Sequence, residues 1–205
     1  MEPSVKGVLM LGVVVAVRRH RDQGRVPAPQ LEARLSGAAL EMIDRKIDIG
    51  RWYPIGVFCE LLDVDWDVGG RRNPDYARAE GTRAADRLFD GGIYQQLAFA
   101  ERAERVSTRD QLVRRAKLIT TITGTLYNFL TFEVRTDPER SDHLEILYGN
   151  AKAFSEALRH TTEGFMNQIN TRQGSARCWT SQRRRPDQVV FRMPLSSRLI
   201  GDPPR

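Results

Sequence analysis

The spacing of apolar residues changes near residue 130, and this change restricts the possible folds more than any other feature of the sequence. Before it, apolar residues recur every three or four positions, which is typical of helices with a buried face. After it, they recur at every second position, which is typical of strands. The alternating residues are Leu130, Phe132, Val134, Leu144, Ile146 and Tyr148. Residues 137–140 supply a turn between the two runs, so a β-hairpin is predicted.

The C-terminal part of the chain repeats this alternation after a helix. Residues 176–180 and 189–193 flank a polar turn at 183–187, which predicts a second hairpin. The residues with helical spacing between the hairpins, over 151–169, are Phe154, Leu158, Thr161 and Phe165. We therefore expect an α+β fold: a helical N-terminal half packed on a four-stranded antiparallel sheet made of two β-hairpins flanking a helix.

Helices are predicted throughout the first half, and capping residues mark their ends. Ser36 and Asn73 are candidate N-caps, and glycines at 50, 69–70 and 91–92 are candidate stops. The expected helices lie between Ser36 and Gly50 and over residues 55–62, 74–89, 93–104 and 112–130. The last of these has apolar residues off its main stripe, Ile122 and Phe129, which is consistent with a dimer interface as well as a core.

Residues 7–17 form an apolar run that is too short to span a bilayer as a helix. Arg18, Arg19 and Arg21 follow the run, whereas a signal peptide carries its positive charge before the apolar stretch. We interpret the run as a buried strand or helix of a cytoplasmic protein with no membrane span. An amphipathic membrane anchor is the alternative, although the run is apolar on all sides.

The chain has 205 residues, of which 40% are hydrophobic, so it can form one compact domain, expected over residues 1–200 with a flexible tail at 201–205. Cys59 and Cys178 lie in apolar patterns without a CxxC motif, so buried reduced thiols and no metal site are expected.

The alternating acids Asp63, Asp65 and Asp67 do not match a calcium loop and are interpreted as a solvated loop at a helix end. No phosphate-binding loop or nucleophilic serine motif is present in the sequence.

The order of elements over residues 40–193 resembles a known superfamily. It is the fold of 4-vinyl-reductase-type small-molecule-binding domains, one class of TRAPP small subunits and haem nitric-oxide-binding domains. Local residues also resemble an uncharacterised bacterial family expanded in myxobacteria. The residues that carry this second resemblance are Lys6-Gly7, Trp52-Tyr53-Pro54, Phe58, Leu61-Leu62, Tyr76, Gly81 and Glu163-Gly164-Phe165. The order of elements implies a sensing or adaptor role rather than catalysis, whereas the second family has no assigned activity.

The resemblance to haem nitric-oxide-binding domains implies a test for haem. Those sensors use a proximal His on a helix and a Tyr-x-Ser-x-Arg triplet, and this chain has no such triplet. Its histidines are His20 in a basic run expected at the surface, His143 in the predicted hairpin turn and His160 on a helix. No cofactor is therefore expected.

The other two members of the superfamily imply roles for the cysteines. Vinyl-reductase-type domains often close with a cysteine pair, of which only Cys178 is present here. TRAPP subunits enclose a channel that can hold an acyl chain on a cysteine, for which Cys59 is the candidate. A small buried core residue is the other interpretation of Cys59, and we favour it.

Aromatic residues beside a helix-starting proline, Trp52 and Tyr53, can line a pocket or lock the first helices together. Glu163-Gly164-Phe165 has the same two interpretations, with Gly164 allowing close helix–sheet packing. The candidate ligand-pocket or partner-contact residues are Trp52, Tyr53, Phe58, Cys59, Leu126 and Phe165. No catalytic residue is predicted.

A net charge of +6 raises a second class of function, because nucleic acids attract basic proteins. Arg183, Arg184 and Arg185 at the predicted hairpin tip are candidate contacts for an anion or nucleic acid. Acidic residues are interspersed along the chain and no DNA-binding spacing is present in the sequence, which favours a solvated basic surface.

The sequence predicts a non-enzymatic sensor or adaptor domain that acts as a homodimer and binds a small hydrophobic ligand, a partner protein or both. A nucleic-acid-binding regulator is the alternative, and an enzyme comes third. A sensor should have an apolar cavity, a nucleic-acid binder should group its arginines on one face, and an enzyme should bring carboxylates and a His or Lys together in a cleft.

Overall fold

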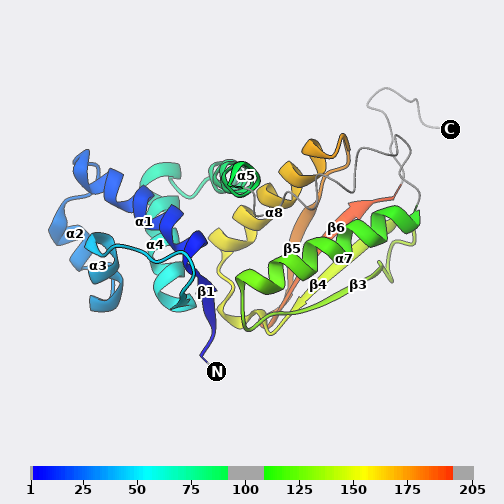
Figure 1. Cartoon of the computed structure of the whole chain (residues 1–205), viewed down its shortest axis with the longest axis horizontal. Coiled ribbons are helices and arrows are strands. Elements are labelled where there is room, and N and C mark those ends of the chain that lie inside the picture. The colour runs from blue at the N-terminus through cyan, green and yellow to red at the C-terminus, as the bar shows by residue number, and fades with distance from the viewer. Residues whose placement is uncertain (1, 92–108, 196–205) are drawn as a thin grey trace.

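The computed structural model describes residues 2–91 and 109–195. The helix expected over residues 93–104 and the tail expected at 201–205 lie outside the described residues. The fold is α+β, as predicted, with helices gathered at one end and a four-stranded sheet at the other (Figure 1).

The N-terminal end is built from helices and one short pair of strands. Its elements are β1 (Ser4–Lys6), α1 (Gly7–Asp22), α2 (Ala28–Glu32), α3 (Gly37–Asp44), β2 (Trp52–Pro54), α4 (Ile55–Gly70) and α5 (Pro74–Asp90). β1 and β2 pair antiparallel. Both predicted N-caps are confirmed, because the Ser36 side chain accepts a hydrogen bond from the Ala39 N–H and the Asn73 side chain accepts one from the Asp75 N–H.

The C-terminal end holds the sheet and two long helices. Its elements are α7 (Arg109–Leu126), β3 (Thr131–Thr136), β4 (His143–Gly149), the 3₁₀ turn η1 (Ala151–Ala153), α8 (Glu156–Arg172), β5 (Thr180–Arg185) and β6 (Gln188–Pro194). The two predicted hairpins join through β4 and β6, so the strand order is β3-β4-β6-β5. The inward-facing side chains are fully buried: Leu144, Ile146, Tyr148, Val189, Phe191 and Met193.

The second hairpin differs from its predicted boundaries. The strand begins at Thr180 rather than 176, and the arginines continue the strand instead of forming the turn. The reason is that the partly buried Arg183 is held in the strand by its guanidinium, which donates to the carbonyls of Phe154 and Pro186. The tight turn therefore falls at Pro186-Asp187.

The apolar run at residues 7–17 is a helix, α1, which extends through the basic residues to Asp22. This placement corrects the expectation for His20, which is buried (1% exposed) rather than on the surface. His143 is likewise the first residue of β4 and not part of the turn. Among the described residues, no helix is long and apolar enough to cross a membrane.

Helix α4 is twice as long as expected and contains the acidic residues that were interpreted as a loop. It ends where Arg71 adopts a left-handed conformation, with φ 49°. Asp67 pairs with Arg34 and Arg72, and Asp65 faces inward (3% exposed). Cys178 is exposed, which corrects the expectation of a buried thiol, since the chain leading to β5 is not a strand.

Helices α5 and α8 cross in the middle of the molecule, between its two ends (Figure 1), and their backbones touch. A Cβ atom on Gly81 would lie 1.9 Å from the Thr161 carbonyl oxygen, and one on Gly164 would lie 1.9 Å from the Arg78 carbonyl oxygen. Only glycine fits at both positions. Gly164 thus permits close packing, as predicted, but against helix α5 rather than the sheet.

Candidate ligand-binding cleft

An apolar cavity of about 80 Å³ lies where the helical end meets α7 and α8. The apolar residues that line it come from five helices and the residue after α7: Leu9, Val13, Ala16, Phe58, Leu62, Ala84, Leu126, Tyr127, Leu158 and Phe165. In a reported case an apolar cavity of about 150 Å³ stays dry and binds benzene, so this cavity has room for only a few heavy atoms.

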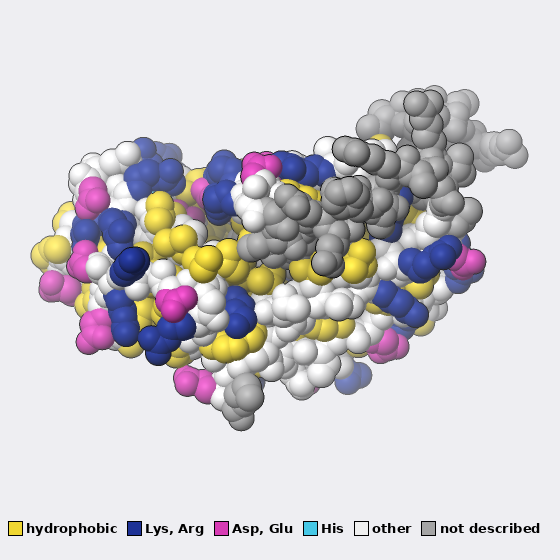
Figure 2. Space-filling view, in the orientation of Figure 1, with side chains coloured by type: hydrophobic (Ala, Val, Ile, Leu, Met, Phe, Trp, Pro, Cys, Tyr) yellow, Lys and Arg dark blue, Asp and Glu magenta, His cyan; other side chains and the backbone are white. Residues whose placement is uncertain are grey.

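A larger groove of about 490 Å³ adjoins the cavity between α1 and α5. The two spaces share lining residues, namely Leu9, Gly12, Ala16, Glu80, Ala84 and Arg87. Leu11, Val15 and Ile49 of the groove are exposed apolar residues, which proteins usually cover. In Figure 2 a band of hydrophobic side chains crosses the helical end of the visible face, with Lys and Arg side chains beside it. We call cavity and groove together the cleft.

The polar side chains at the inner part of the cleft already have partners. Asp65 Oδ1 accepts a hydrogen bond from Tyr76 Oη at 3.0 Å and lies 2.9 Å from His20 Nε2. Glu80 accepts from the Arg83 guanidinium. An apolar ligand in the cavity would therefore leave the Asp65 and Glu80 carboxylates with their existing hydrogen bonds.

Burial changes the ionisation of these groups. Burial raises the pKa of Asp65, and the hydrogen bond from His20 partly opposes this increase. The pKa of Tyr76 is raised by burial and by the nearby carboxylate of Asp65. For Glu80, burial alone would raise the pKa, but hydrogen bonding and attraction to Arg83 outweigh it and lower the pKa. Glu80 therefore faces the cleft as a neutralised ion pair.

Three of the six residues proposed from sequence meet at the cavity: Phe58 from α4, Leu126 from α7 and Phe165 from α8. The other three do not line the cleft. Tyr53 is buried under the N-terminal helices, where its hydroxyl accepts from the Asp48 N–H at 2.9 Å. Trp52 is 41% exposed and stacks under the Lys6 ammonium.

Cys59 lies next to Phe58 in the sequence but on another side of α4. Its thiol donates a hydrogen bond to the Ala153 carbonyl oxygen at 3.4 Å, and burial raises its pKa. A thiol with a raised pKa carries little thiolate, which is the reactive form. The position agrees with the small core residue favoured from the sequence.

Sequence reasoning missed the α1 and α5 walls of the cleft, including Leu9, Glu80, Ala84 and Arg87. One signal was present in α5, because Ala77, Gly81 and Ala85 give this helix a stripe of small residues. That stripe indicates close approach of a second helix on one side. It does not show that the opposite side borders an open groove.

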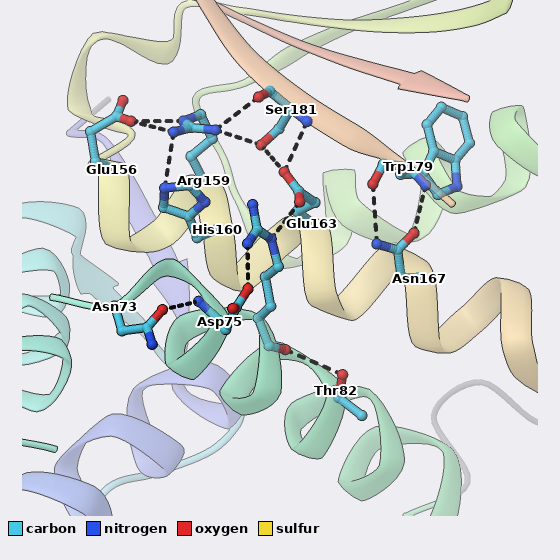
Figure 3. Close-up of polar contacts among 11 residues, drawn as sticks. Asn73, Asp75, Thr82, Glu156, Arg159, His160, Glu163, Asn167, Trp179 and Ser181 are labelled. Carbon is cyan, nitrogen blue, oxygen red and sulfur yellow. Dashed lines mark hydrogen bonds and ion pairs between the residues drawn. The ribbon is translucent and has the colours of Figure 1, made fainter. Parts of the chain in front are cut away.

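A polar network ties α5 to α8 and the sheet (Figure 3). Glu163 on α8 is buried, and its carboxylate accepts from Arg78 Nε at 2.5 Å and from the Ser181 N–H at 2.9 Å. Arg159 donates to the Ser181 carbonyl oxygen at 2.9 Å and pairs with Glu156. A shift of α5 would therefore be transmitted to β5 through Glu163.

Several arginines of the basic runs at residues 18–21 and 183–185, the second of which is the candidate nucleic-acid contact, bind acceptors within the chain. Arg18 donates to the Ile43 carbonyl oxygen, and Arg21 pairs with Asp44. Arg183 pairs with Glu156, and Arg184 pairs with the fully buried Glu145. Arg185 alone of the hairpin cluster is exposed without such a contact in the described part of the chain.

Solved structures with a similar fold are H-NOX proteins. One from K. algicida, in the Fe(II) unliganded state, is 13% identical, with a TM-score of 0.59 over 96% of this chain and 100% of that chain. One from S. oneidensis, in the Fe(II)NO state, is 14% identical, with a TM-score of 0.53 over 94% and 99% of the two chains. An oxygen-binding H-NOX domain related to soluble guanylate cyclases is 11% identical, with a TM-score of 0.52 over 96% and 100%.

At these identities the likeness establishes a shared fold, which confirms the haem-nitric-oxide-binding-like architecture predicted from the order of elements. No family model and no curated sequence matches the chain.

The residues present do not fit a haem. None of the three histidines lines the cleft: His20 is bonded to Asp65 behind its wall, His143 to Asp142, and His160 adjoins Arg159. Among the described residues lining cavity and groove there is no His, Cys or Met to ligate iron. The cavity is also far too small for a porphyrin ring.

Proposed function

We propose that this protein is a haem-independent, non-enzymatic sensor domain that binds a small apolar molecule in the cleft between α1 and α5. The observation that carries the proposal is the continuity of the apolar groove with the smaller apolar cavity, which share six lining residues. Small-molecule sites are mostly apolar spaces of about 300–1,000 Å³, and the groove falls in this range.

The two walls of the cleft suggest how binding would be sensed. Helix α5 is fixed to α8 by the glycine crossing, and α8 is bonded to β5 through Glu163. A ligand that changes the distance between α1 and α5 would also displace α8, which is packed against α5. The displacement would reach the sheet through the bond between α8 and β5. A binding event can shift a conformational equilibrium only if it favours one arrangement, so ligand contacts to both walls are required.

The protein is further proposed to act in the cytoplasm as a homodimer, with a partner protein reading the change. Ile122 and Phe129, which first suggested a dimer face, pack against other apolar residues of the same chain. The dimer is therefore proposed without a defined interface. The nucleic-acid alternative has less support, because its arginines are largely paired internally.

The experiment is thermal unfolding of the full chain with 1-decanol as the probe. Ligand at 100 times its Kd should add about 2.7 kcal/mol to stability. Ala84→Leu fills the space shared by cavity and groove and should abolish the increase in Tm. Ala38→Leu adds the same side chain at an exposed site on α3 and should leave the increase intact. Equal shifts in all three proteins, or no shift in any, would overturn the proposal.

A further inference from the structure

The groove carries a net positive charge. Arg19 on α1, with Arg83 and Arg87 on α5, lines the groove, together with one acid, Glu80. Glu80 is neutralised by Arg83. In the described part of the chain, Arg19 and Arg87 have no hydrogen-bond acceptor or ion-pair partner, whereas most arginines near the sheet and α8 are paired.

These two guanidiniums are placed on the two walls of the apolar space. Arg87 reaches across from α5 to α1, since a Cβ atom on Gly12 would lie 3.2 Å from Arg87 Nη2. Gly12 and Arg87 both belong to the lining shared by cavity and groove. The Arg87 guanidinium, which also attracts the Glu80 carboxylate, thus lines the apolar cavity as well as the groove.

Resting on the function proposed above, we infer that the ligand is an amphipathic anion: an apolar body that occupies the cleft and one carboxylate that Arg87 and Arg19 bind. Guanidinium groups suit this role because they present several N–H donors in a plane that matches a carboxylate. The apolar body fits the groove residues Leu11, Val15 and Leu88, and a cationic ligand would be repelled by Arg19 and Arg87.

The test compares two ligands with equal chains, decanoate and 1-decanol, by isothermal titration at low and high salt. Exposed ion pairs contribute at most about 1 kcal/mol, so decanoate should bind about five-fold more tightly than decanol at low salt. Added salt should reduce this preference. The double variant Arg19→Gln/Arg87→Gln should bind both ligands with the affinity of decanol.

The matched control is Arg45→Gln/Arg185→Gln, which removes the same charge at two exposed arginines outside the cleft and should retain the preference. Equal binding of decanoate and decanol to wild type, unchanged in Arg19→Gln/Arg87→Gln, would overturn the anion inference and leave the apolar site intact. Absence of binding of both ligands to wild type would overturn the proposed apolar site together with the anion inference.

Discussion

The two sides of helix α5 are built differently. One side touches α8 backbone to backbone through Gly81 and Gly164 and is sealed by the Arg78–Glu163 ion pair. The other side faces α1 across a groove with exposed apolar residues and a guanidinium that spans the gap. A packed contact resists displacement, whereas a groove admits a ligand. The difference predicts that any displacement of α5 relative to α1 also displaces α8.

The largest expected effect comes from the packed side. Gly81→Ala and Gly164→Ala each place a methyl group within 2 Å of a backbone oxygen, which cannot yield as a flexible side chain can. Each should lower the free energy of unfolding by about 3 kcal/mol or more, measured by urea denaturation. Gly56→Ala is the matched control, because a Cβ atom there meets nothing within 4 Å and the change should stay below about 1 kcal/mol. Equal losses in the free energy of unfolding at all three glycines would show that the backbone contact between α5 and α8 does not require glycine.

The seal beside the crossing should be the next most sensitive feature. Glu163→Ala leaves the Ser181 N–H without its acceptor, and the expected loss in the free energy of unfolding is about 2 kcal/mol. Arg78 is partly exposed, so water compensates for much of its lost ion pair. Glu156→Ala, at a half-exposed carboxylate of the same helix, should cost less than about 1 kcal/mol. If Glu163→Ala is as stable as Glu156→Ala, the contacts of Glu163 do not stabilise the α5–α8 crossing.

Helix α1 offers a direct comparison of a packed and an open position. Val14 is fully buried and Val15 is 50% exposed on the groove. Val14→Ala should destabilise the protein by about 2 kcal/mol through lost burial and a residual cavity, while Val15→Ala should change stability by less than about 0.5 kcal/mol. Calorimetric Tm values for the two variants test this. A large loss of stability in Val15→Ala would mean that another part of the chain packs on Val15 and fills the groove.

The smallest expected effect is a pH-dependent one at the inner end of the cleft. Because burial raises the pKa of Asp65, the folded state binds more protons than the unfolded state around that pKa, and stability falls as pH rises through it. Asp65→Asn should therefore match the stability of wild type below the ordinary Asp pKa and exceed it at neutral pH.

Asp86→Asn is the control of opposite sign. Hydrogen bonds from Gln168 and Arg172 lower the pKa of Asp86, so its contribution is present above the ordinary pKa and is lost as pH falls through the lowered one. This variant should be less stable than wild type at neutral pH and approach it in acid. Parallel pH profiles for the two variants would contradict both assignments.

Much of the fold was predictable because it depends on local patterns. Alternation identified the strands of both hairpins, and the caps at Ser36 and Asn73 mark where two helices begin. The helix ends that were wrong depend on distant partners. Helix α1 continues past its apolar run to Asp22, and within this extension His20 is bonded to Asp65, 45 residues away, a pair that no local pattern contains.

The candidate site was predictable only in part, for the same reason. Phe58, Leu126 and Phe165 were found because large apolar residues at helical spacing face a core, and any internal cavity is lined by such residues. Glu80, Ala84 and Arg87 are of ordinary types for an exposed helix. Their importance arises from the gap between α1 and α5, which is set by tertiary packing.

Native mass spectrometry of the full chain with added 1-decanol tests most directly whether the cleft is a ligand site, and it also counts subunits. Wild type and Ala38→Leu should each retain one decanol per chain, and Ala84→Leu should retain none. Equal retention by Ala84→Leu and wild type, or no retention by wild type, would contradict the claim that the cleft between α1 and α5 binds a small apolar molecule.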